Sequence, residues 1–577
     1  MKSKFNNNGF KSQGTDMETN FEYKRSCGVL MHISSLPSPY GIGTMGKEAY
    51  KFVDFLHDSG MSYWQLLPIC PTSYGDSPYQ SYCIYAGNPY FIDLDLLYGM
   101  GLICKKDFEQ AGINTDDINA DCGNVSITGP SYSYVDYGDL YKKRYAVLKK
   151  AADTFFEKFI ENHSEFIENR SERKEGYLSS EKSGVNTAGS SGPQGTILRF
   201  RHTDITQDYK RFCAENAVWL DSYSLFMALK EYNGGESWYS WKDGCSRYES
   251  PRVSAFEMSN VKNIEFWKIT QYLFFFQWFA LKEYAESRNI GIIGDLPIYV
   301  SIDSVDVWKN PELFQLDENR MPKEVSGCPP DNFSKEGQLW GNPLYDWERM
   351  ERDDFKWWIR RIEYMCKIYD VLRIDHFRGF ESYYAIPYKT GDALKGRWKQ
   401  GPGMKIFNAL FKHSGRKRII AEDLGFLTEG VKNLLKNSGF PGMKVIEIAF
   451  DSRDPAAKDY LPHNFIRNCV AYTGTHDNDT LLGWLSSASE ADVNFAKAYL
   501  RIKDDSEFNW DVIAALLATV ASTCIIQAQD LLDLGSEARM NTPSTVGKNW
   551  KWRANKGDFN SRLAKKVKEM LTLYNRI

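Results

Sequence analysis

Four short apolar runs in the sequence each end in a carboxylate, and carboxylates can do acid, base or nucleophilic chemistry. The four segments are Gly294-Asp295-Leu296, Arg373-Ile374-Asp375, Ala421-Glu422-Asp423 and Thr475-His476-Asp477. A carboxylate beside an apolar run is costly to bury unless it has a role or a partner. One such position is usually a helix cap or a satisfied salt bridge. Four of them, two beside a histidine, indicate a shared site.

Glycoside chemistry needs this set of groups. One carboxylate attacks the anomeric carbon, and a second, protonated one donates to the leaving oxygen and later acts as the base. A third can hold substrate hydroxyls. Arg373 lies two positions before Asp375, and a neighbouring cation should keep such a nucleophile ionised. The acid needs a raised pKa instead, which an ionised Asp375 close by would help to produce.

Eight apolar runs predict the strands that must position these groups. Their nearly continuous apolar character is typical of strands buried on both faces of a parallel sheet. Helical periodicity lies between several of them, for example at 354–369 and 428–437. Strands alternating with helices predict an α/β fold, and eight strands favour a (β/α)8 TIM barrel with large, mainly helical insertions over an open sheet. The runs are 28–33, 63–68, 290–296, 371–374, 418–421, 444–450, 469–473 and 523–527.

The uneven spacing of these runs predicts the insertions. Helix-like segments occur at 140–159 and 216–231, far from any predicted strand. Between 179 and 195, nine of 17 residues are Gly or Ser, which indicates a flexible surface loop or linker without function. The predicted organisation is an N-terminal tail over 1–24 and a catalytic barrel over 25–577, interrupted by a mainly helical insertion at about 97–260 and a loop region at the barrel mouth at about 300–350.

Composition and charge argue against several classes of protein. The 577 residues include 71 Lys and Arg against 75 Asp and Glu. Without a basic run, neither a nucleic acid nor a membrane surface is expected as a partner. The longest apolar stretch, 512–526, is too short to span a bilayer and is interpreted as a buried helix running into a strand. The aromatic share of 15% suits a sugar-binding groove, although a large aromatic core is the simpler explanation.

The start of the chain and its cysteines predict a cytoplasmic protein. The first residues contain no apolar segment of the kind found in signal peptides. The 11 cysteines are scattered singly, with no CxxC pair and no histidine at zinc-binding spacing. Such a pattern predicts reduced thiols in the cytosol and no metal site.

Longer motifs resemble those of the α-amylase clan, and more narrowly those of amylomaltases, glycoside hydrolase family 77. The segment RIDHFRG is similar to the family's nucleophile motif, AEDLG to its acid/base motif and THDNDT to the motif of its third carboxylate. The resemblance implies a retaining 4-α-glucanotransferase with Asp375 as nucleophile, Glu422 as general acid/base and Asp477 as transition-state stabiliser. It implies no cofactor, a maltodextrin or amylose donor, and a glucose or maltodextrin acceptor.

The resemblance covers most of the chain. The segment GCPPDNFSKEGQLWGNPLYDW is similar to a loop that arches over the family's cleft, while the stretch 179–195 matches nothing in the family. The C-terminal ARMNTPSTVGKNWKWR also resembles the family, but it has Ser544 where Gly is expected and an extra Lys548. The substrate-binding residues that the resemblance implies are Tyr79, Asp295, Trp340, Arg373, His376 and His476.

Three alternative functions remain to be weighed. A hydrolase of the same clan shares the first half-reaction, and only the arching loop, which could exclude water, argues against it. A non-catalytic glucan-binding barrel is disfavoured by the intact carboxylates. A phosphate-binding barrel enzyme is disfavoured because no Gly-rich phosphate loop lies near the last two strands. For the retaining reading, the Asp375 and Glu422 carboxyl groups should lie roughly 5–5.5 Å apart.

Overall fold

An eight-stranded parallel sheet forms the centre of the protein. The computed structural model describes residues 24–73, 75–113, 134–161, 192–330, 336–390, 392–425, 427–452 and 456–577. The strands are β1 (Ser26–Leu30), β2 (Tyr63–Gln65), β3 (Gly291–Leu296), β6 (Val371–Ile374), β9 (Ile419–Ala421), β10 (Gly442–Val445), β11 (Cys469–Tyr472) and β12 (Thr523–Gln527). Their order is β10-β11-β12-β1-β2-β3-β6-β9. The backbone N–H of Ala421 donates to the carbonyl of Pro441 at 2.9 Å, so the two ends of the sheet meet.

The predicted (β/α)8 barrel is confirmed, and each of the eight apolar runs overlaps one of its strands. The strands are short and almost entirely buried, as expected for a sheet covered on both faces. Several boundaries differ, and the difference is largest for the run 444–450, which is strand only as far as Val445. Ile446 has helical dihedral angles, φ −68° and ψ −30°, and a 3-10 helix, η9 (Glu447–Phe450), follows it.

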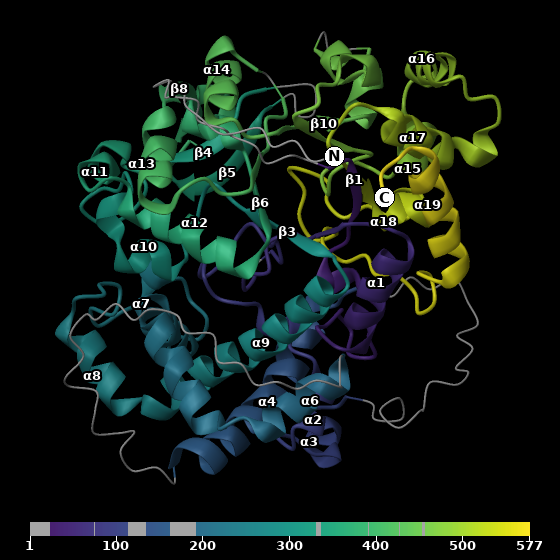
Figure 1. The fold of residues 1–577 in the computed structure, drawn as a ribbon. Helices are drawn as coiled ribbons and strands as arrows, with labels where there is room; N and C mark the ends of the chain where they lie inside the picture. The colour runs from purple at the N-terminus through teal and green to yellow at the C-terminus, as the bar shows by residue number, and fades with distance from the viewer. Residues whose placement is uncertain are drawn as a thin grey trace, which may run out of the picture.

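Helices pack around the barrel (Figure 1). Helix α12 (Lys356–Ile368) lies on β3 and β6, where it buries Trp358, Ile362 and Met365 on one face. Helix α14 (Glu429–Ser438) begins at Thr428, whose side chain accepts from the backbone N–H of Val431 and so caps the helix. The other outer helices include α1 (Lys47–Asp58), α13 (Met404–Ser414), α17 (Phe508–Ala518) and α19 (Ser561–Leu573).

A group of helices between β2 and β3 forms the lower part of the molecule in Figure 1. Within it, α7 and α9 pack along each other. Helix α7 buries Trp219, and α9 buries Trp267 and Phe275. The Gly- and Ser-rich stretch 179–195 lies outside the described residues as far as 191, and its end forms the first turn of α6. The helices are α2 (Leu94–Gly99), α3 (Lys105–Gln110), α4 (Tyr137–Phe156), α6 (Pro193–His202), α7 (Ile205–Tyr232), α8 (Pro251–Ser259) and α9 (Val261–Ser287).

A second, antiparallel sheet lies beside the barrel, and two of its four strands fall in the region 300–350, where the sequence suggested only a loop region. Its strands are β4 (Glu324–Cys328), β5 (Gln338–Pro343), β7 (Ser382–Pro387) and β8 (Arg397–Gln400), in the order β5-β4-β7-β8. β4 pairs with both β5 and β7. We call this four-stranded unit the lid sheet. The sequence pattern did not predict this sheet because β4 contains Gly and β5 contains Gly and Pro. In addition, β7 is separated from β4 along the chain by the barrel strand β6.

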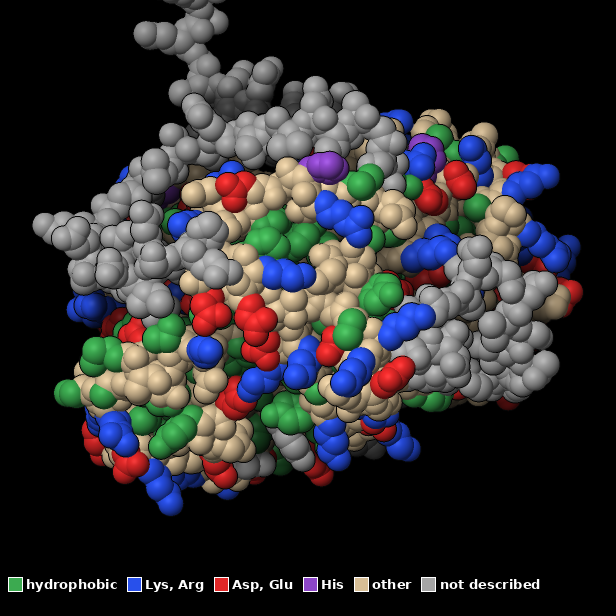
Figure 2. Space-filling model, turned by 90° about the horizontal axis from the view of Figure 1, so that it is seen from below, with side chains coloured by type: hydrophobic (Ala, Val, Ile, Leu, Met, Phe, Trp, Pro, Cys, Tyr) green, Lys and Arg blue, Asp and Glu red, His purple; other side chains and the backbone are tan. Residues whose placement is uncertain are grey.

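The surface carries both signs of charge. On the face shown in Figure 2, Lys and Arg side chains are interspersed with Asp and Glu, and neither sign forms a continuous patch. In the part of the chain that the structure describes, no helix is long and apolar enough to cross a membrane.

Arg576, next to the C-terminal residue, closes the bottom of the barrel. It is fully buried, and its guanidinium donates to four backbone carbonyls, those of Ser26, Leu517, Thr519 and Ala521, at 2.8–3.2 Å. These carbonyls belong to β1, to α17 and to the turn before β12. One side chain therefore ties the first strand of the barrel to the last.

Arg576→Ala should lower the free energy of unfolding by roughly 3 kcal/mol, because several charged hydrogen bonds are lost and their carbonyls stay buried. Urea unfolding followed by tryptophan fluorescence measures the change, with Arg562→Ala on the exposed face of α19 as the matched control. A urea midpoint equal to that of the control would show that the Arg576 hydrogen bonds contribute nothing to stability.

Candidate active site

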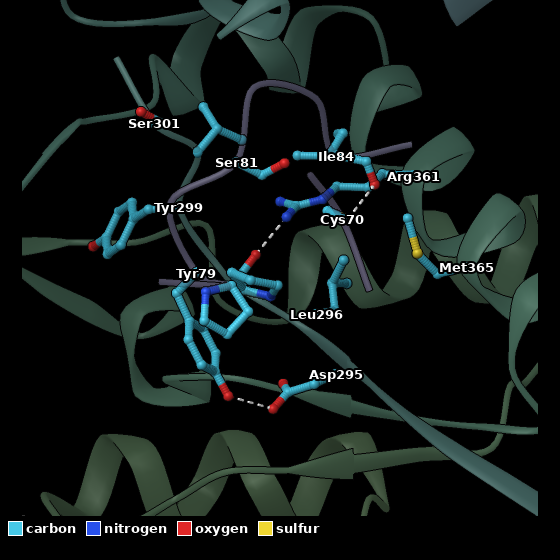
Figure 3. Close-up of a pocket in the computed structure, with 13 residues that line it drawn as sticks. Cys70, Tyr79, Ser81, Ile84, Asp295, Leu296, Tyr299, Ser301, Arg361 and Met365 are labelled. Carbon is cyan, nitrogen blue, oxygen red and sulfur yellow. Dashed lines mark hydrogen bonds between the residues drawn. The ribbon is translucent and has the colours of Figure 1, made fainter. Parts of the chain in front are cut away.

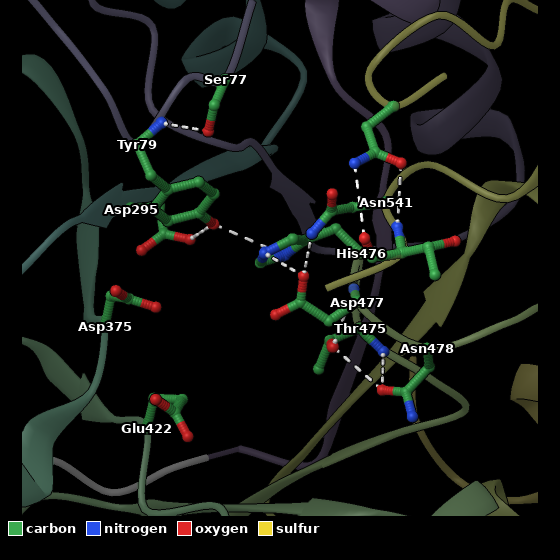
Figure 4. A network of polar contacts seen from close by, with 12 residues as sticks. Ser77, Tyr79, Asp295, Asp375, Glu422, Thr475, His476, Asp477, Asn478 and Asn541 are labelled. Atoms are coloured by element: carbon green, nitrogen blue, oxygen red, sulfur yellow. Dashed lines mark hydrogen bonds and ion pairs between the residues drawn. The ribbon is translucent and has the colours of Figure 1, made fainter. Parts of the chain in front are cut away.

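The four carboxylates singled out in the sequence all lie at the carboxyl-terminal end of the barrel. Asp295 is the second-last residue of β3, Asp375 follows β6, Glu422 follows β9 and Asp477 follows β11. The backbone N–H of Asp375 donates to Leu296 O, and that of Glu422 donates to Ile374 O, both at 3.0 Å. Strand pairing thus continues beyond the strand ends and brings neighbouring carboxylates to one level (Figure 4).

Arg373 is the cation at the centre of the site. Its Nη1 donates to both oxygens of Asp295, at 2.6 and 2.7 Å, and lies 3.3 Å from Oδ1 of Asp375. Burial alone would lower the pKa of Arg373, but Asp295 above all, with Tyr79 and Asp375, raises it well above its ordinary value. Arg373 is therefore a fixed positive charge in contact with both Asp295 and Asp375.

Tyr79 completes this buried network from the segment after β2. Its hydroxyl donates to Oδ2 of Asp295 at 2.7 Å. Its ring stacks on that of His476, with centroids 5.0 Å apart and 20° between the planes. Burial and the carboxylate of Asp295 raise the pKa of Tyr79 well above its ordinary value, so the hydroxyl stays protonated. The Tyr79 and His476 rings form one wall of the site.

Backbone donors hold both oxygens of Glu422. The N–H of His376 donates to Oε2 at 2.6 Å, and the N–H of Leu424 donates to Oε1 at 2.8 Å. His376 has left-handed dihedral angles, φ 47° and ψ 49°, which are uncommon for a residue other than Gly. This turn after Asp375 points the N–H of His376 at the neighbouring strand, and the two carboxyl groups are fixed with respect to each other.

Burial changes the expected protonation of this pair. It raises the pKa of Asp375 well above its usual range, with Asp295, Glu422 and Asp477 adding to the shift and Arg373 opposing it. Burial also raises the pKa of Glu422, against the effect of Arg373 and of the two backbone donors. Arg373 does lower the pKa of Asp375, as the sequence suggested, but burial outweighs it, and Arg373 bonds mainly to Asp295. Burial thus shifts the pKa of both carboxyl groups in the same direction.

The two histidines of the site are neutral. Burial, together with the charge of Arg378, lowers the pKa of His376 to about 3. Burial also lowers the pKa of His476, although Asp477 opposes the shift. Neutral imidazoles can accept or donate a hydrogen bond to a sugar hydroxyl without adding charge.

Asp477 is the most exposed member of the set, with 47% of its side chain accessible. Its Oδ1 accepts from Nδ2 of Asn541 at 2.5 Å and lies 3.5 Å from Nε2 of His476. The turn that carries it is held by Asn478, whose Oδ1 accepts from both the N–H and the hydroxyl of Thr475 at 2.9 Å. The carboxylate therefore projects from a loop, whereas the other three stand at strand ends.

The lid sheet reaches the site through Trp340 on β5. The Trp340 ring meets that of His376 edge-on, with centroids 4.8 Å apart and 85° between the planes. Tyr299 lies in the segment after β3, and its ring centroid is 6.3 Å from that of Trp340 and 6.5 Å from that of His376. Part of the expected arching loop, 331–335, lies outside the described residues. Two aromatic rings, those of Trp340 and Tyr299, thus lie beside His376, the residue after Asp375.

A small cavity lies next to the site and is lined by Tyr79 and Tyr299, among other residues (Figure 3). Tyr79 and Asp295 line it on the side of the carboxylates, and Tyr299, Ser301 and Arg361 line it on the other. Arg361 is fully buried and donates to the carbonyls of Pro297 and Ile298, at 2.5 and 3.2 Å. These bonds fix the segment that carries Tyr299.

The structure brings all nine predicted site residues together at the barrel mouth. Sequence reasoning missed Tyr299, Arg539, Asn541 and the backbone donor of Leu424, of which only Tyr299 lies outside the motifs that had been noticed. Among the described residues, no three His, Cys, Asp or Glu side chains are placed to hold a metal ion. The arrangement offers a buried carboxylate pair, a third accessible carboxylate, a fixed cation and aromatic walls.

Comparison with known proteins agrees with this chemistry. A family model described as 4-alpha-glucanotransferase matches residues 31–181 and 195–558, and the gap between the two segments falls in the Gly- and Ser-rich stretch. The 4-alpha-glucanotransferase of Clostridium butyricum is 43% identical over 550 residues, 95% of this chain and 100% of that protein. The 4-alpha-glucanotransferase of Streptococcus pneumoniae is 40% identical over 556 residues, 96% of this chain and 98% of that protein.

A solved structure is similar over the same length. The amylomaltase from Streptococcus agalactiae in complex with acarbose has a TM-score of 0.82 and 39% sequence identity to this chain. The similarity covers 96% of this chain and 100% of that one.

Proposed function

The chain belongs to the 4-alpha-glucanotransferase family, glycoside hydrolase family 77, and is a 4-alpha-glucanotransferase; from this premise we propose a retaining mechanism through a covalent glycosyl-enzyme. The donor is a maltodextrin or amylose, and the acceptor is glucose or another maltodextrin. The observation that carries the proposal is the placement of Asp375 and Glu422 on neighbouring strands, with hydrogen bonds that fix their relative position.

Asp375 is the proposed nucleophile. One of its carboxylate oxygens attacks C1 of the donor while the bond from C1 to the leaving O4 breaks, and the proton of Glu422 passes to that O4. In the second step the acceptor gives the proton of its 4-hydroxyl to Glu422, its O4 attacks C1, and the ester bond to Asp375 breaks. Two inversions leave the new bond with the α-configuration of the old one. The 5–5.5 Å separation of the two carboxyl groups stays a prediction.

The shared proton of the pair belongs on Glu422 when the donor is bound. Burial raises the pKa of both groups, and two ionised carboxylates at this separation would repel each other. Arg373 lies 3.3 Å from Asp375, and this contact favours the ionised form of the nucleophile over that of the acid. The backbone donors on Glu422 work in the other direction, so substrate binding must supply part of the difference.

Asp477 and the residues around it bind the sugar at the cleavage point. The accessible carboxylate of Asp477 can accept from sugar hydroxyls and stabilise the positive charge that develops at C1. The stacked rings of Tyr79 and His476 offer a flat wall for the same sugar. Asp295 and Arg373 neutralise each other beneath it.

Trp340 and Tyr299 favour transfer over hydrolysis. Both are aromatic, both lie beside His376, and Trp340 comes from the lid sheet over the barrel mouth. We assign them to the acceptor side, where a stacked sugar ring displaces water from the ester on Asp375. Binding energy from such distant rings can then accelerate attack by a sugar hydroxyl.

The thiols of the chain fit a reducing compartment. The cysteines in the described part of the chain are free, and most of them are buried. Free thiols in such numbers are typical of cytosolic proteins, so we place the reaction in the cytoplasm.

Incubation with maltotriose tests the proposal. We expect glucose and a ladder of longer maltodextrins, with little net rise in reducing ends, because each transfer makes one α-1,4 bond for each one it breaks. Chromatography by chain length and a reducing-end assay on the same samples measure both quantities. A steady rise in reducing ends without products longer than maltotriose would identify a hydrolase instead.

A further inference from the structure

Asp477 needs an outside partner to hold its carboxylate. Asp375 and Glu422 are fixed by strand ends and by Arg373 or backbone donors, whereas Asp477 projects from a turn with 47% of its side chain accessible. An accessible Asp side chain can occupy more than one staggered rotamer. Its contact with His476 is long, 3.5 Å, and fixes the rotamer only weakly.

The partner comes from the C-terminal part of the chain, far along the sequence. Nη2 of Arg539 donates to the carbonyl of Asp477 at 2.6 Å, and the N–H of Asn541 donates to the carbonyl of His476 at 3.1 Å. Nδ2 of Asn541 donates to Oδ1 of Asp477 at 2.5 Å, as Figure 4 shows. Two of these bonds hold the backbone of the turn, and only the third reaches the carboxylate.

The segment that carries Asn541 is itself held under strain. Ser544 and Trp550 have left-handed φ values of 62° and 64°, a conformation that costs a residue with a side chain about 1 kcal/mol or more. The N–H of Trp550 donates to Met540 O at 2.7 Å, and its carbonyl accepts from the hydroxyl of Tyr137 at 2.9 Å. Strained residues of this kind persist where the surroundings over-determine them, and they cluster at functional sites.

The Trp550 ring also packs against the stacked rings of Tyr79 and His476. Its ring centroid lies 5.9 Å from that of Tyr79 and 5.7 Å from that of His476. The same short segment therefore supports the stacked rings with one residue and the third carboxylate with another. Its placement is coupled to the site on two sides.

We propose that Asn541 is a positioning residue for glucan transfer, whose amide holds Oδ1 of Asp477 and turns Oδ2 toward the sugar. Among the described residues, no protein group donates to Oδ2, so this oxygen is available for a substrate hydroxyl. The inference rests on the proposed role of Asp477. It adds that the third carboxylate works only in the rotamer that Asn541 selects.

Asn suits this role and Asp does not. An amide can donate to a carboxylate, whereas a carboxylate at the same place has no proton to give and repels its neighbour. Arg539 and the backbone of Asn541 keep the turn in place without the amide, because both of their bonds go to carbonyl oxygens. Loss of the amide should therefore disturb the carboxylate and spare the fold.

The test is a double-mutant cycle on maltotriose disproportionation. Asn541→Ala and the isosteric Asn541→Asp should each lower kcat by about 10- to 100-fold, since a misplacement of about 1 Å has effects of this size. KM should change less than about threefold. Thermal unfolding should show midpoints equal to that of the parent. In an Asp477→Asn background, the same changes should cost less than about twofold, because the carboxylate that Asn541 positions is already gone.

Thr545→Ala is the matched control. Thr545 lies in the same exposed turn and donates to Thr542 O at 2.7 Å, away from Asp477, so its rate should stay within about twofold of the parent. If Asn541→Ala unfolds, Asn541→Asp, which keeps the shape, carries the test.

Three results would overturn the proposal. In the first, the losses in kcat from the Asn541 and Asp477 variants multiply in the double variant, which would show that Asn541 acts independently of Asp477. Alternatively, KM rises with kcat unchanged, which makes Asn541 a substrate ligand. In the third, Asp477→Asn alone keeps nearly full activity, so that the proposed role of Asp477 fails first. The single Asp477 variant thus separates failure of the proposed function from failure of the positioning inference.

Discussion

Asp375→Asn should lower the rate of glucan transfer by roughly 10⁴-fold while leaving the fold intact, because loss of a nucleophile removes the covalent route. The amide has nearly the shape of the carboxylate, and the N–H of Asp375 still donates to Leu296 O. Arg373 keeps its closest partner, Asp295, so the buried cation stays neutralised. The unfolding midpoint should therefore shift little.

Release of glucose from maltotriose measures this loss, in a preparation free of the unsubstituted enzyme. Asp354→Asn is the control: this carboxylate pairs on the surface with Lys412 at 2.8 Å, and its loss should leave the rate within about twofold of the parent. If Asp375→Asn kept more than a few per cent of the activity, Asp375 would not be the nucleophile.

Glu422→Gln should be comparably slow on maltodextrins but should recover glycosylation with an α-maltosyl fluoride donor. Fluoride leaves without a proton, so the acid's first role becomes dispensable, while transfer between maltodextrins still needs it. The amide keeps one oxygen for the backbone donors of His376 and Leu424, which bond to both oxygens of the acid. Some loss of alignment should therefore remain even with the fluoride.

The pH dependence gives a second readout for Glu422. Burial raises the pKa of the acid, and donation requires its protonated form, so activity on maltodextrins should be present below that pKa and fall as the pH rises through it. With the fluoride donor this alkaline loss should disappear in Glu422→Gln. Fluoride release by electrode and glucose release from maltotriose measure the two activities. An equal loss on both donors at every pH would assign Glu422 a structural role.

Much of the barrel and of its site could be predicted from the sequence, because the relevant signals are local. A strand buried on both faces must be apolar along its whole length, and such runs were visible at all eight strands. A carboxylate at the end of such a run is costly without a partner, which marked Asp295, Asp375 and Glu422. The resemblance of motifs then suggested their separate roles.

The lid sheet could not be predicted in this way. Strand β4 pairs with β7, and the two are separated along the chain by β5, two α-helices and the barrel strand β6. The Gly and Pro residues in and around β4 and β5 suggested a loop, and the second partner of β4, strand β7, lies far along the chain. The early end of the run 444–450 has a similar origin, since Glu447 turns out of the strand toward Asn478.

The protonation of the site was also decided by the tertiary structure. From the sequence, Arg373 two positions from Asp375 suggested an ionised nucleophile. In the fold, Arg373 bonds mainly to Asp295, and burial shifts both members of the Asp375 and Glu422 pair in the same direction. Sequence spacing records which charges are near along the chain, whereas burial depends on everything packed around them.

The sequence by itself determined the barrel, the strand ends at which the carboxylates lie and the reaction class, because short apolar runs and contiguous motifs carry that information. Only the tertiary structure decided what holds those groups in place. Asn541 meets Asp477 across 64 residues of the chain, and Arg576 meets Ser26 across 550. Neither pair has a local signature, since the free energy of such contacts comes from burial and hydrogen bonding that exist only after folding.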